Sequence, residues 1–484
     1  MSGSSRDGRV ERYVEAQRER LLAELLEFLR IPSVSTDPRH AGDVARAADF
    51  VAESLRRAGL QATVHPTAGH PVVTAQTPAR TGAPTVLVYG HYDVQPAEPL
   101  DAWTTPPFEP VIDGGRIRAR GASDDKGQVF AHVKAVEALR DLDGGWPLNV
   151  RFVIEGEEEV GSPHLAEFLR AHRDDLAADV ALVSDGAMVA RETPTITYGL
   201  RGLAYLTVRV RAAGRDLHSG AYGGGVPNAL LALCGMLASL KDEDGRVAVP
   251  GFYDRVRPLD VDERRRMAAV PFDREAFVRD AGVSATPGEV GYQLLERLWA
   301  RPTLDVHGLG GGFVGDGAKT VIPAEGIAKL SCRLVADQDP RWVADAVRDH
   351  LVRVAPEGVS VEVTVEGLGE AALAPLDHPA VAAVARALEA VWGRSVVYAR
   401  TGGSIPVVGE LQRLLGAVPV LLDMGLEDDR LHAPDEKFEV RHYLQGIRAS
   451  AAALGELAVA LGTDRAVATA DDRRDGGVRG EAGR

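Results

Sequence analysis

The stretch TVLVYGHYDVQP, residues 85–96, joins an apolar run of strand length to a histidine and an aspartate. A continuous apolar run predicts a strand buried on both faces, as in a parallel sheet. His91 and Asp93 stand two residues apart, so on an extended segment their side chains point the same way. The aspartate could then accept the second imidazole N–H and select the histidine tautomer that binds a metal. Taken alone, however, a His-x-Asp sequence is a weak signal of function.

The same junction recurs further along the chain. The run NVRFVIEG, residues 149–156, leads into consecutive glutamates, and VALVS, residues 180–184, leads into Asp185. Helical patterns separate these runs, and one of them, from about residue 126, follows Asp124 in RGASDDKG. Strands that alternate with helices predict an α/β fold with a parallel sheet. Because the carboxyl ends of parallel strands form the ligand crevice of such a fold, we expect these side chains at one edge of the sheet.

The acidic run Glu157, Glu158 and Glu159 raises an electrostatic question. Adjacent carboxylates raise one another's pKa unless a positive centre lies among them. A solvated loop is the ordinary interpretation of such a run taken alone. Histidine and carboxylate groups on separate loops, without cysteine, are instead typical of a zinc-type site with open coordination positions.

The pattern of the chain changes near residue 203. LAYLTVRVRA, residues 203–212, alternates apolar and polar residues, which predicts a strand with one solvated face. The first pattern returns near residue 377. We therefore predict a parallel-sheet domain made of residues 1–202 and 370–463, interrupted by a smaller α/β lid at 203–369. The glycine-rich GLGGGF, residues 308–313, is expected to be a flexible segment of that lid.

The composition limits which classes of function are compatible with the chain. The chain has 484 residues and a formal net charge of −15, which argues against nucleic acid or an anionic membrane surface as a partner. Two cysteines in a chain of this length fit a reducing cytosol, and the first residues lack the apolar core of a signal peptide. We expect a cytoplasmic protein without a membrane span. Residues 464–484 lack large apolar groups, mix both charge signs and are predicted to be a disordered tail.

Nine motifs occur together in the order typical of zinc dipeptidases. They are VLVYGHYDVQP, RGASDDKGQ, IEGEEEVGS, VSDG, TYGLRG, DLHSGAYGG, GAKTVIP, GGSIP and LHAPDEK. The chain resembles the carnosinase and cytosolic non-specific dipeptidase branch of the dinuclear zinc peptidase family over roughly residues 10 to 462. That family also contains aminoacylases, acetylornithine deacetylase, succinyl-diaminopimelate desuccinylase and glutamate carboxypeptidase.

The resemblance implies a centre for two divalent metal ions. Zinc is the first candidate, with manganese or cobalt as alternatives. Asp124 would bridge the ions. His91 and Asp185 would complete the coordination of one ion, and Glu159 and His432 that of the other. In the family a cis peptide bond follows the bridging aspartate, so we expect one between Asp124 and Asp125.

Further roles follow from the same resemblance. Glu158 would be the general base, and Asp93 would orient His91. The lid residue His218 would stabilise the oxyanion in the neighbouring subunit of a homodimer. The substrate's carboxylate and backbone would be held by Arg333, Thr320 and Ser404. Glu157 departs from the close relatives, and its role stays open.

Three functions are compatible with these residues. The first is a metallo-dipeptidase that cleaves the peptide bond of dipeptides with a water molecule activated by two zinc ions. The second is an amidohydrolase of the same family that removes the acyl group from N-acyl amino acids. The third is an inactive, metal-free binding protein, which the intact set of ligand positions disfavours.

Overall fold

The computed structural model describes residues 3–403 and 405–475, and the side chains of residues 8–403 and 405–462. The chain divides into two compact units. Unit 1 comprises Met1–Tyr198, Ala374–Ala399 and Glu410–Arg484, and unit 2 comprises Gly199–Leu373 and Arg400–Gly409. The sequence pattern assigns residues 400–409 to the parallel-sheet domain, but in the structure they group with unit 2. One reason is that the backbone N–H of Arg201 donates to the carbonyl oxygen of Gly403 at 3.0 Å.

The main sheet has a parallel centre and antiparallel edges. Its strands in spatial order are β1 (Gln61–His65), β2 (Val72–Gln76), β6 (Asn149–Glu155), β3 (Thr85–His91), β7 (Val180–Val183), β18 (Val418–Leu422), β9 (Thr195–Leu200) and β16 (Ala372–Leu373), with β17 (Val397–Arg400) paired to β9. The central strands β6, β3, β7 and β18 run parallel. The outer pairings are antiparallel. The predicted α/β class is confirmed, whereas the antiparallel edges were not foreseen.

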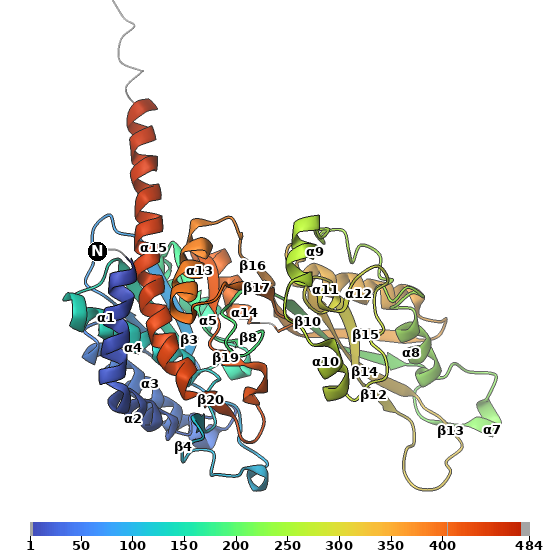
Figure 1. The fold of residues 1–484 in the computed structure, drawn as a ribbon. Coiled ribbons are helices and arrows are strands. Elements are labelled where there is room, and N and C mark those ends of the chain that lie inside the picture. Colours follow the sequence, from blue (N-terminus) through green and yellow to red (C-terminus); the bar gives the residue numbers. More distant parts are fainter. Residues whose placement is uncertain (1–2, 404, 476–484) are drawn as a thin grey trace, which may run out of the picture. The chain divides into compact units, whose positions relative to one another are not determined.

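Helices cover the parallel centre of the sheet (Figure 1). Those of unit 1 are α1 (Gly3–Ala16), α2 (Arg18–Leu29), α3 (Ala41–Arg57), α4 (Lys126–Asp143), α5 (Leu165–Ala171), α6 (Arg173–Leu176), α13 (Pro379–Trp392) and α15 (Val440–Asp475). Helix α14 (Pro406–Glu410) belongs to unit 2 except for its last residue. Helix α4 contacts β3, α13 contacts β18, and α15 packs against both helices. The apolar runs β3 and β6 are buried on both faces, as the sequence predicts.

Helix α15 differs from the prediction in length. It continues to Asp475 and so includes the first part of the segment 464–484 that we expected to be a disordered tail. Residues 463–475 contain no proline or glycine that would stop a helix. Residues 476–484 lie outside the described part of the chain.

One part of α15, Val440–Gly462, is long and apolar enough to cross a membrane by length and composition. In the structure 67% of its most apolar window is buried. The helix packs against α1, α4 and α13, so its apolar character serves the core of unit 1.

Unit 2 contains a four-stranded antiparallel sheet in the order β12 (Thr303–Gly311), β14 (Glu325–Leu334), β10 (Gly202–Arg211) and β15 (Ser360–Gly369). Helices α8 (Ala229–Ala238) and α12 (Pro340–Val354) pack on it. Smaller elements are α7 (Ser219–Tyr222), α9 (Val261–Ala268), α10 (Arg274–Asp280), α11 (Leu294–Trp299), β11 (Leu217–His218) and β13 (Val321–Ile322). The one-sided burial of β15 matches the alternating sequence pattern.

The prediction that residues 308–313 form a flexible segment was wrong for its first four residues. Gly308–Gly311 belong to β12 and pair with β14. At Gly311 the backbone has φ of +137°, and an added Cβ would lie 2.9 Å from the Leu230 side chain. Glycine is therefore required there by close packing between β12 and the start of α8.

Candidate metal centre

The predicted ligands converge at the carboxyl ends of the parallel strands of unit 1. His91 ends β3, and Asp185 follows β7 after one residue. Glu158 and Glu159 begin a short 3-10 helix (Glu158–Val160) after β6. Asp124 precedes α4, and His432 lies in the loop before β20 (Lys437–Glu439), with φ of +60°.

The first trio consists of His91, Asp124 and Asp185, with one ligand atom from each residue within 4.8 Å of the others. The Nε2 atom of His91 lies 3.1 Å from Asp124 Oδ1 and 3.8 Å from Asp185 Oδ1. This Nε2 is buried and makes no hydrogen bond of normal geometry in the described part of the chain. A buried imidazole nitrogen that faces two carboxylates is a suitable ligand for a cation.

The second trio consists of Asp124, Glu159 and His432. The Nε2 atom of His432 lies 2.8 Å from Asp124 Oδ2 and 3.3 Å from Glu159 Oε2. Asp124 thus turns one carboxylate oxygen to each trio, as a bridging ligand must. Two ligands held about 2.1 Å from one tetrahedral zinc ion are roughly 3.4 Å apart, so the spacings in both trios fit a metal of this size. The peptide bond between Asp124 and Asp125 is cis, as predicted.

Asp93 connects the two strand ends. Its backbone carbonyl accepts from His91 Nδ1 at 3.1 Å, while its carboxylate Oδ1 is 3.4 Å from the same nitrogen. The carboxylate also accepts the backbone N–H groups of Glu158 and Glu159, at 3.2 and 3.1 Å. Asp93 therefore orients the imidazole partly through its backbone, and it also fixes the segment that carries the predicted base.

The electrostatics of the cluster favour added positive charge. Burial raises the pKa of Glu158 well above its usual value, and Asp185 and Asp124 raise it further. Burial and Asp124 raise the pKa of Glu159 to about 8. Burial lowers the pKa of His91, but its carboxylate neighbours, Asp124 first, outweigh that effect and raise it well above normal. So many carboxylates cannot ionise together in a buried site without a cation.

Comparison with known proteins agrees with this geometry. The sequence profile of peptidase family M20/M25/M40 matches residues 87–456. The chain belongs to this family.

Relatives in this peptidase family match the chain over nearly its whole length. A Beta-Ala-His dipeptidase of Homo sapiens is 32% identical over 468 residues, which cover 93% of this chain and 92% of the relative. A Cys-Gly metallodipeptidase of Schizosaccharomyces pombe is 32% identical over 461 residues, covering 92% and 97%. The solved structure of the dipeptidase Dug1p from Saccharomyces cerevisiae has a TM-score of 0.78 at 30% identity and covers 95% of this chain and 99% of its own.

Glu157, whose role the sequence left open, turns away from both trios. Its Oε2 atom lies 2.8 Å from His164 Nδ1. An added Cβ at Gly69 would lie 1.9 Å from its Oε1 atom, so the side chain packs tightly against the backbone there. Glu157 therefore anchors the glutamate loop of this peptidase and lies outside both trios.

The sequence did not predict the supporting contacts of three residues near the site. The buried carboxylate of Glu436 accepts the backbone N–H groups of Ser123 and Asp124 at 2.9 and 3.1 Å. Gln95 donates its side-chain amide to Glu159 Oε2 at 2.8 Å. Asp125 Oδ2 accepts the backbone N–H of His91 at 3.1 Å. All three lie inside the quoted motifs, but nothing in those motifs separates supporting residues from ligands.

The remaining predicted residues belong to unit 2. His218 is exposed, and its Nδ1 accepts the backbone N–H of Gly220 at 3.0 Å. The backbone carbonyl of Thr320 accepts the N–H of Ser219 at 3.1 Å, so the structure brings His218 and Thr320 close together. Arg333 lies on β14, and Ser404 lies outside the described residues.

Arg201 is a further residue of unit 2 that the sequence analysis did not single out, although TYGLRG contains it. It precedes β10, where Leu203 pairs with Arg333. Its Nε donates to the carbonyl oxygen of Gly402 at 3.0 Å. Burial and the nearby Arg333 lower the pKa of Arg201 to about 10, so the side chain keeps its charge at neutral pH. The nearby Asp305 acts in the opposite direction, so this part of unit 2 already combines positive charge with one carboxylate.

Proposed function

We propose that the protein is a metal-dependent dipeptidase that uses two divalent ions, zinc in the first place, to hydrolyse the peptide bond of dipeptides. The observation that carries the proposal is the pair of trios that share Asp124 beside Glu158. The relatives named Beta-Ala-His dipeptidase and Cys-Gly metallodipeptidase support dipeptides as the substrate class.

The residues divide the chemistry among them. Bound ions would polarise the scissile carbonyl and lower the pKa of a water molecule from 15.7 toward about 7. Glu158 is the group that takes a proton from the attacking water and delivers it to the leaving amine. His91, whose Nδ1 is directed at the Asp93 carbonyl, would have its Nε2 available to hold an ion.

Unit 2 would supply the groups that hold the substrate. His218 would stabilise the oxyanion of the tetrahedral intermediate, and Arg333, Thr320 and Ser404 would hold the carboxylate and backbone of the peptide. We add Arg201 to this set because it carries a positive charge beside Arg333 and binds the segment that contains Gly402.

Hydrolysis by the purified, zinc-loaded protein tests the proposal. Dipeptides, tripeptides and N-acyl amino acids should be compared at equal concentration, with manganese- and cobalt-loaded protein in parallel. Turnover of dipeptides above the other classes is the expected result. Preference for N-acyl amino acids would instead identify a deacylase of the same family, and absence of metal uptake would identify a binding protein.

Replacing Arg201 with methionine should raise KM for dipeptides by roughly tenfold or more, because one charge of a carboxylate-binding pair is lost. The same change should have little effect on the residual cleavage of dipeptides with an amidated C-terminus. The measurement is kcat and KM for matched free and amidated peptides.

Arg209→Met is the control for this variant, because Arg209 is an exposed arginine on the neighbouring strand β10. It should leave both substrates unaffected. An equal loss on free and amidated peptides in the Arg201 variant would mean that Arg201 only supports the structure of residues 402–403.

We also propose that the protein is a homodimer assembled through unit 2. Strand β12 is an edge strand, and Leu309 on it is 54% exposed. Leu231 on the adjacent helix α8 is 73% exposed. An unpaired strand edge next to exposed leucines is typical of a surface that pairs with another chain.

The double variant Leu231→Glu and Leu309→Glu should therefore be monomeric, because charges on both patches oppose apolar contact between chains. Sedimentation velocity on wild-type and variant protein gives the mass directly. Val459→Glu, a comparable exposed position on α15, is the control and should stay dimeric. A monomeric wild-type protein would contradict the proposal.

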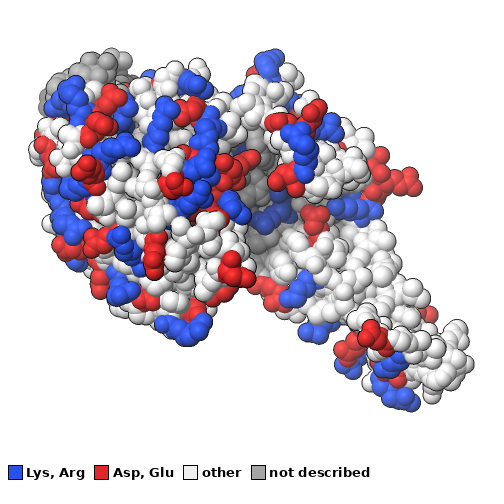
Figure 2. All heavy atoms as spheres, turned by 60° about the horizontal axis from the view of Figure 1, so that its bottom comes forward, with Lys and Arg blue, Asp and Glu red and all other residues white. Residues whose placement is uncertain are grey.

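For location and other partners we propose the cytoplasm and no nucleic-acid ligand. Both cysteines are free, Cys332 buried and Cys234 exposed, which supports a reducing compartment. The face in Figure 2 mixes acidic and basic side chains without a broad basic area, in keeping with the net charge of −15.

A further inference from the structure

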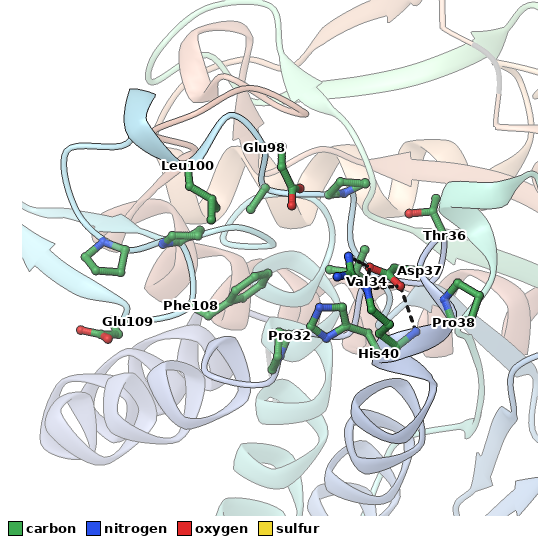
Figure 3. A pocket seen from close by; sticks show the side chains of 15 residues that line it. Pro32, Val34, Thr36, Asp37, Pro38, His40, Glu98, Leu100, Phe108 and Glu109 are labelled. Carbon is green, nitrogen blue, oxygen red and sulfur yellow. Dashed lines mark hydrogen bonds and ion pairs between the residues drawn. The ribbon is translucent and has the colours of Figure 1, made fainter.

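A pocket of about 720 Å³ lies in unit 1 apart from the metal ligands (Figure 3). Two segments line it, one within residues 32–40 and the other within residues 96–109. No residue of either metal-binding trio contributes to its lining. The catalytic proposal therefore gives this pocket no role.

The walls of the pocket are mainly apolar and rigid. Leu100, Phe108 and Val34 surround the space in Figure 3, and prolines make up much of the remaining lining: Pro32, Pro38, Pro96, Pro106 and Pro107. Proline has a fixed φ and little conformational entropy to lose, so such walls are largely formed before a ligand enters.

The charged side chains that line the pocket differ in whether they have a partner of opposite charge. Arg39 is engaged by Asp37, with Nε 3.0 and 2.9 Å from the two carboxylate oxygens. The Nδ1 atom of His40 is held by Asp43 at 2.7 Å. The exposed carboxylate of Glu98 points toward the space between Phe108 and Val34 (Figure 3). It makes no hydrogen bond within the described part of the chain, and after Asp37 its charge contributes to the raised pKa of Arg39.

This distribution defines the chemistry of a matching ligand. Three carboxylates, those of Asp37, Glu98 and Glu109, line the pocket against the one guanidinium of Arg39, and this negative charge favours a cation. The aromatic face of Phe108 favours it further. The apolar walls favour a hydrophobic body on that cation. A ligand carboxylate would have to compete with Asp37, which already engages Nε and Nη2 of Arg39. The best match is an amine with an apolar group and no carboxylate.

Hydrogen bonds connect the segments that line the pocket to the residues of the candidate metal centre. Val94 donates its N–H to the Ser33 carbonyl at 3.0 Å, and the Ser33 hydroxyl donates to the Tyr92 carbonyl at 2.6 Å. Tyr92 directly follows the ligand His91. Gln95, just before the pocket residue Pro96, donates to the ligand Glu159.

A second connection runs through Arg120. Its Nη2 donates to the Pro96 carbonyl at 3.1 Å, and its Nη1 donates to Glu436 at 2.8 Å. Glu436 in turn accepts the backbone N–H of Asp124. A displacement of residues 94–96 would therefore change the positions of ligands of both metal ions.

We propose that this pocket is a second ligand site, which binds a small amine with an apolar body and whose occupancy changes the affinity of the metal centre. The site is independent of the peptides that the enzyme cleaves. Coupling of this kind is reciprocal, so metal binding must alter amine affinity by the same factor.

Calorimetric titration of the zinc-loaded protein with 2-phenylethylamine tests the binding. We expect saturable binding of one amine per chain, weaker binding of 2-phenylethanol and of L-phenylalanine, and a roughly fivefold loss of amine affinity in Glu98→Gln. Asp101→Asn, an exposed carboxylate of the same loop that does not line the pocket, should bind like wild type.

Trp103 offers an optical signal from the same site. Its Nε1 donates to the carbonyl of the pocket residue Ala97 at 2.7 Å, so bound amine should change its fluorescence, and Trp103→Phe should remove that change. Equal affinity of Glu98→Gln and wild type, or equal binding of the alcohol, would overturn the assignment of the site. An amine that bound at the metal centre would give that result.

Competition with a chromophoric chelator tests the coupling. Saturating amine should change the apparent zinc dissociation constant of wild-type protein by about fivefold and leave that of Glu98→Gln nearly unchanged. An identical zinc affinity with and without amine would refute the coupling. Neither measurement requires peptide hydrolysis, so both can succeed or fail independently of the proposed dipeptidase activity.

Discussion

Replacing Glu158 with glutamine should lower kcat for dipeptides by about 10³- to 10⁴-fold, because the variant loses the group that carries the proton. Both metal ions should remain bound, since the two trios do not include Glu158. KM should change little, as the amide keeps nearly the volume and shape of the carboxylate. Metal content by elemental analysis, together with kcat and KM, measures all three effects.

Glu157→Gln is the matched control, because it makes the same chemical change one residue away. Glu157 is held by His164 and not by a metal ligand, so this variant should keep its metal and most of its activity. Loss of metal in Glu157→Gln, with metal retained in Glu159→Gln, would show that the assignment of the glutamate run is shifted by two residues.

Asp124→Asn should remove at least one of the two metal ions and lower kcat/KM by roughly 10³-fold or more, since each lost 1.4 kcal/mol of transition-state stabilisation is tenfold in rate. The reason is geometric. Asp124 turns Oδ1 to His91 and Oδ2 to His432, and an amide has only one oxygen with which to bind a cation. Elemental analysis of fully loaded protein gives the stoichiometry.

Asp113→Asn, an exposed aspartate on β4 (Val111–Asp113), is the control for a change of charge without a change of ligand. Circular dichroism and thermal unfolding of the Asp124 variant separate metal loss from misfolding. Wild-type protein that holds a single ion when fully loaded would contradict the dinuclear interpretation. Two ions retained in Asp124→Asn would contradict the bridging role.

The residues that meet in the two trios could be predicted in part because strand ends have a local signature. His91 and Asp185 each lie at or just after a buried apolar run, and the crossover rules of α/β folds bring such ends to one edge. His432 lies more than 300 residues beyond Asp124 and was assigned only through the family motif LHAPDEK. No periodicity or spacing indicates that its ring lies 2.8 Å from that carboxylate.

The length of α15 and the course of β12 were harder to predict. An Ala-rich stretch with mixed charge is compatible with both a disordered tail and a helix, and the structure continues the helix to Asp475. The glycines of β12 suggest flexibility in isolation, yet pairing with β14 and packing against Leu230 make them part of a sheet. In both cases local propensity is weak, so the surroundings decide.

By itself the sequence determined the α/β class and the one-sided sheet pattern, because period and apolar runs are local properties of the chain. The two-metal site was predicted only through the resemblance to a family. Tertiary structure alone decided that Glu157 pairs with His164, that Glu436 holds the backbone at Asp124, and that Glu98 lines a proline-rich pocket. Each of these three contacts depends on which group lies next to the carboxylate in space. Packing between segments that are distant in sequence decides that neighbour. The neighbour in turn decides whether a carboxylate serves as a metal ligand, an anchor or a recognition group.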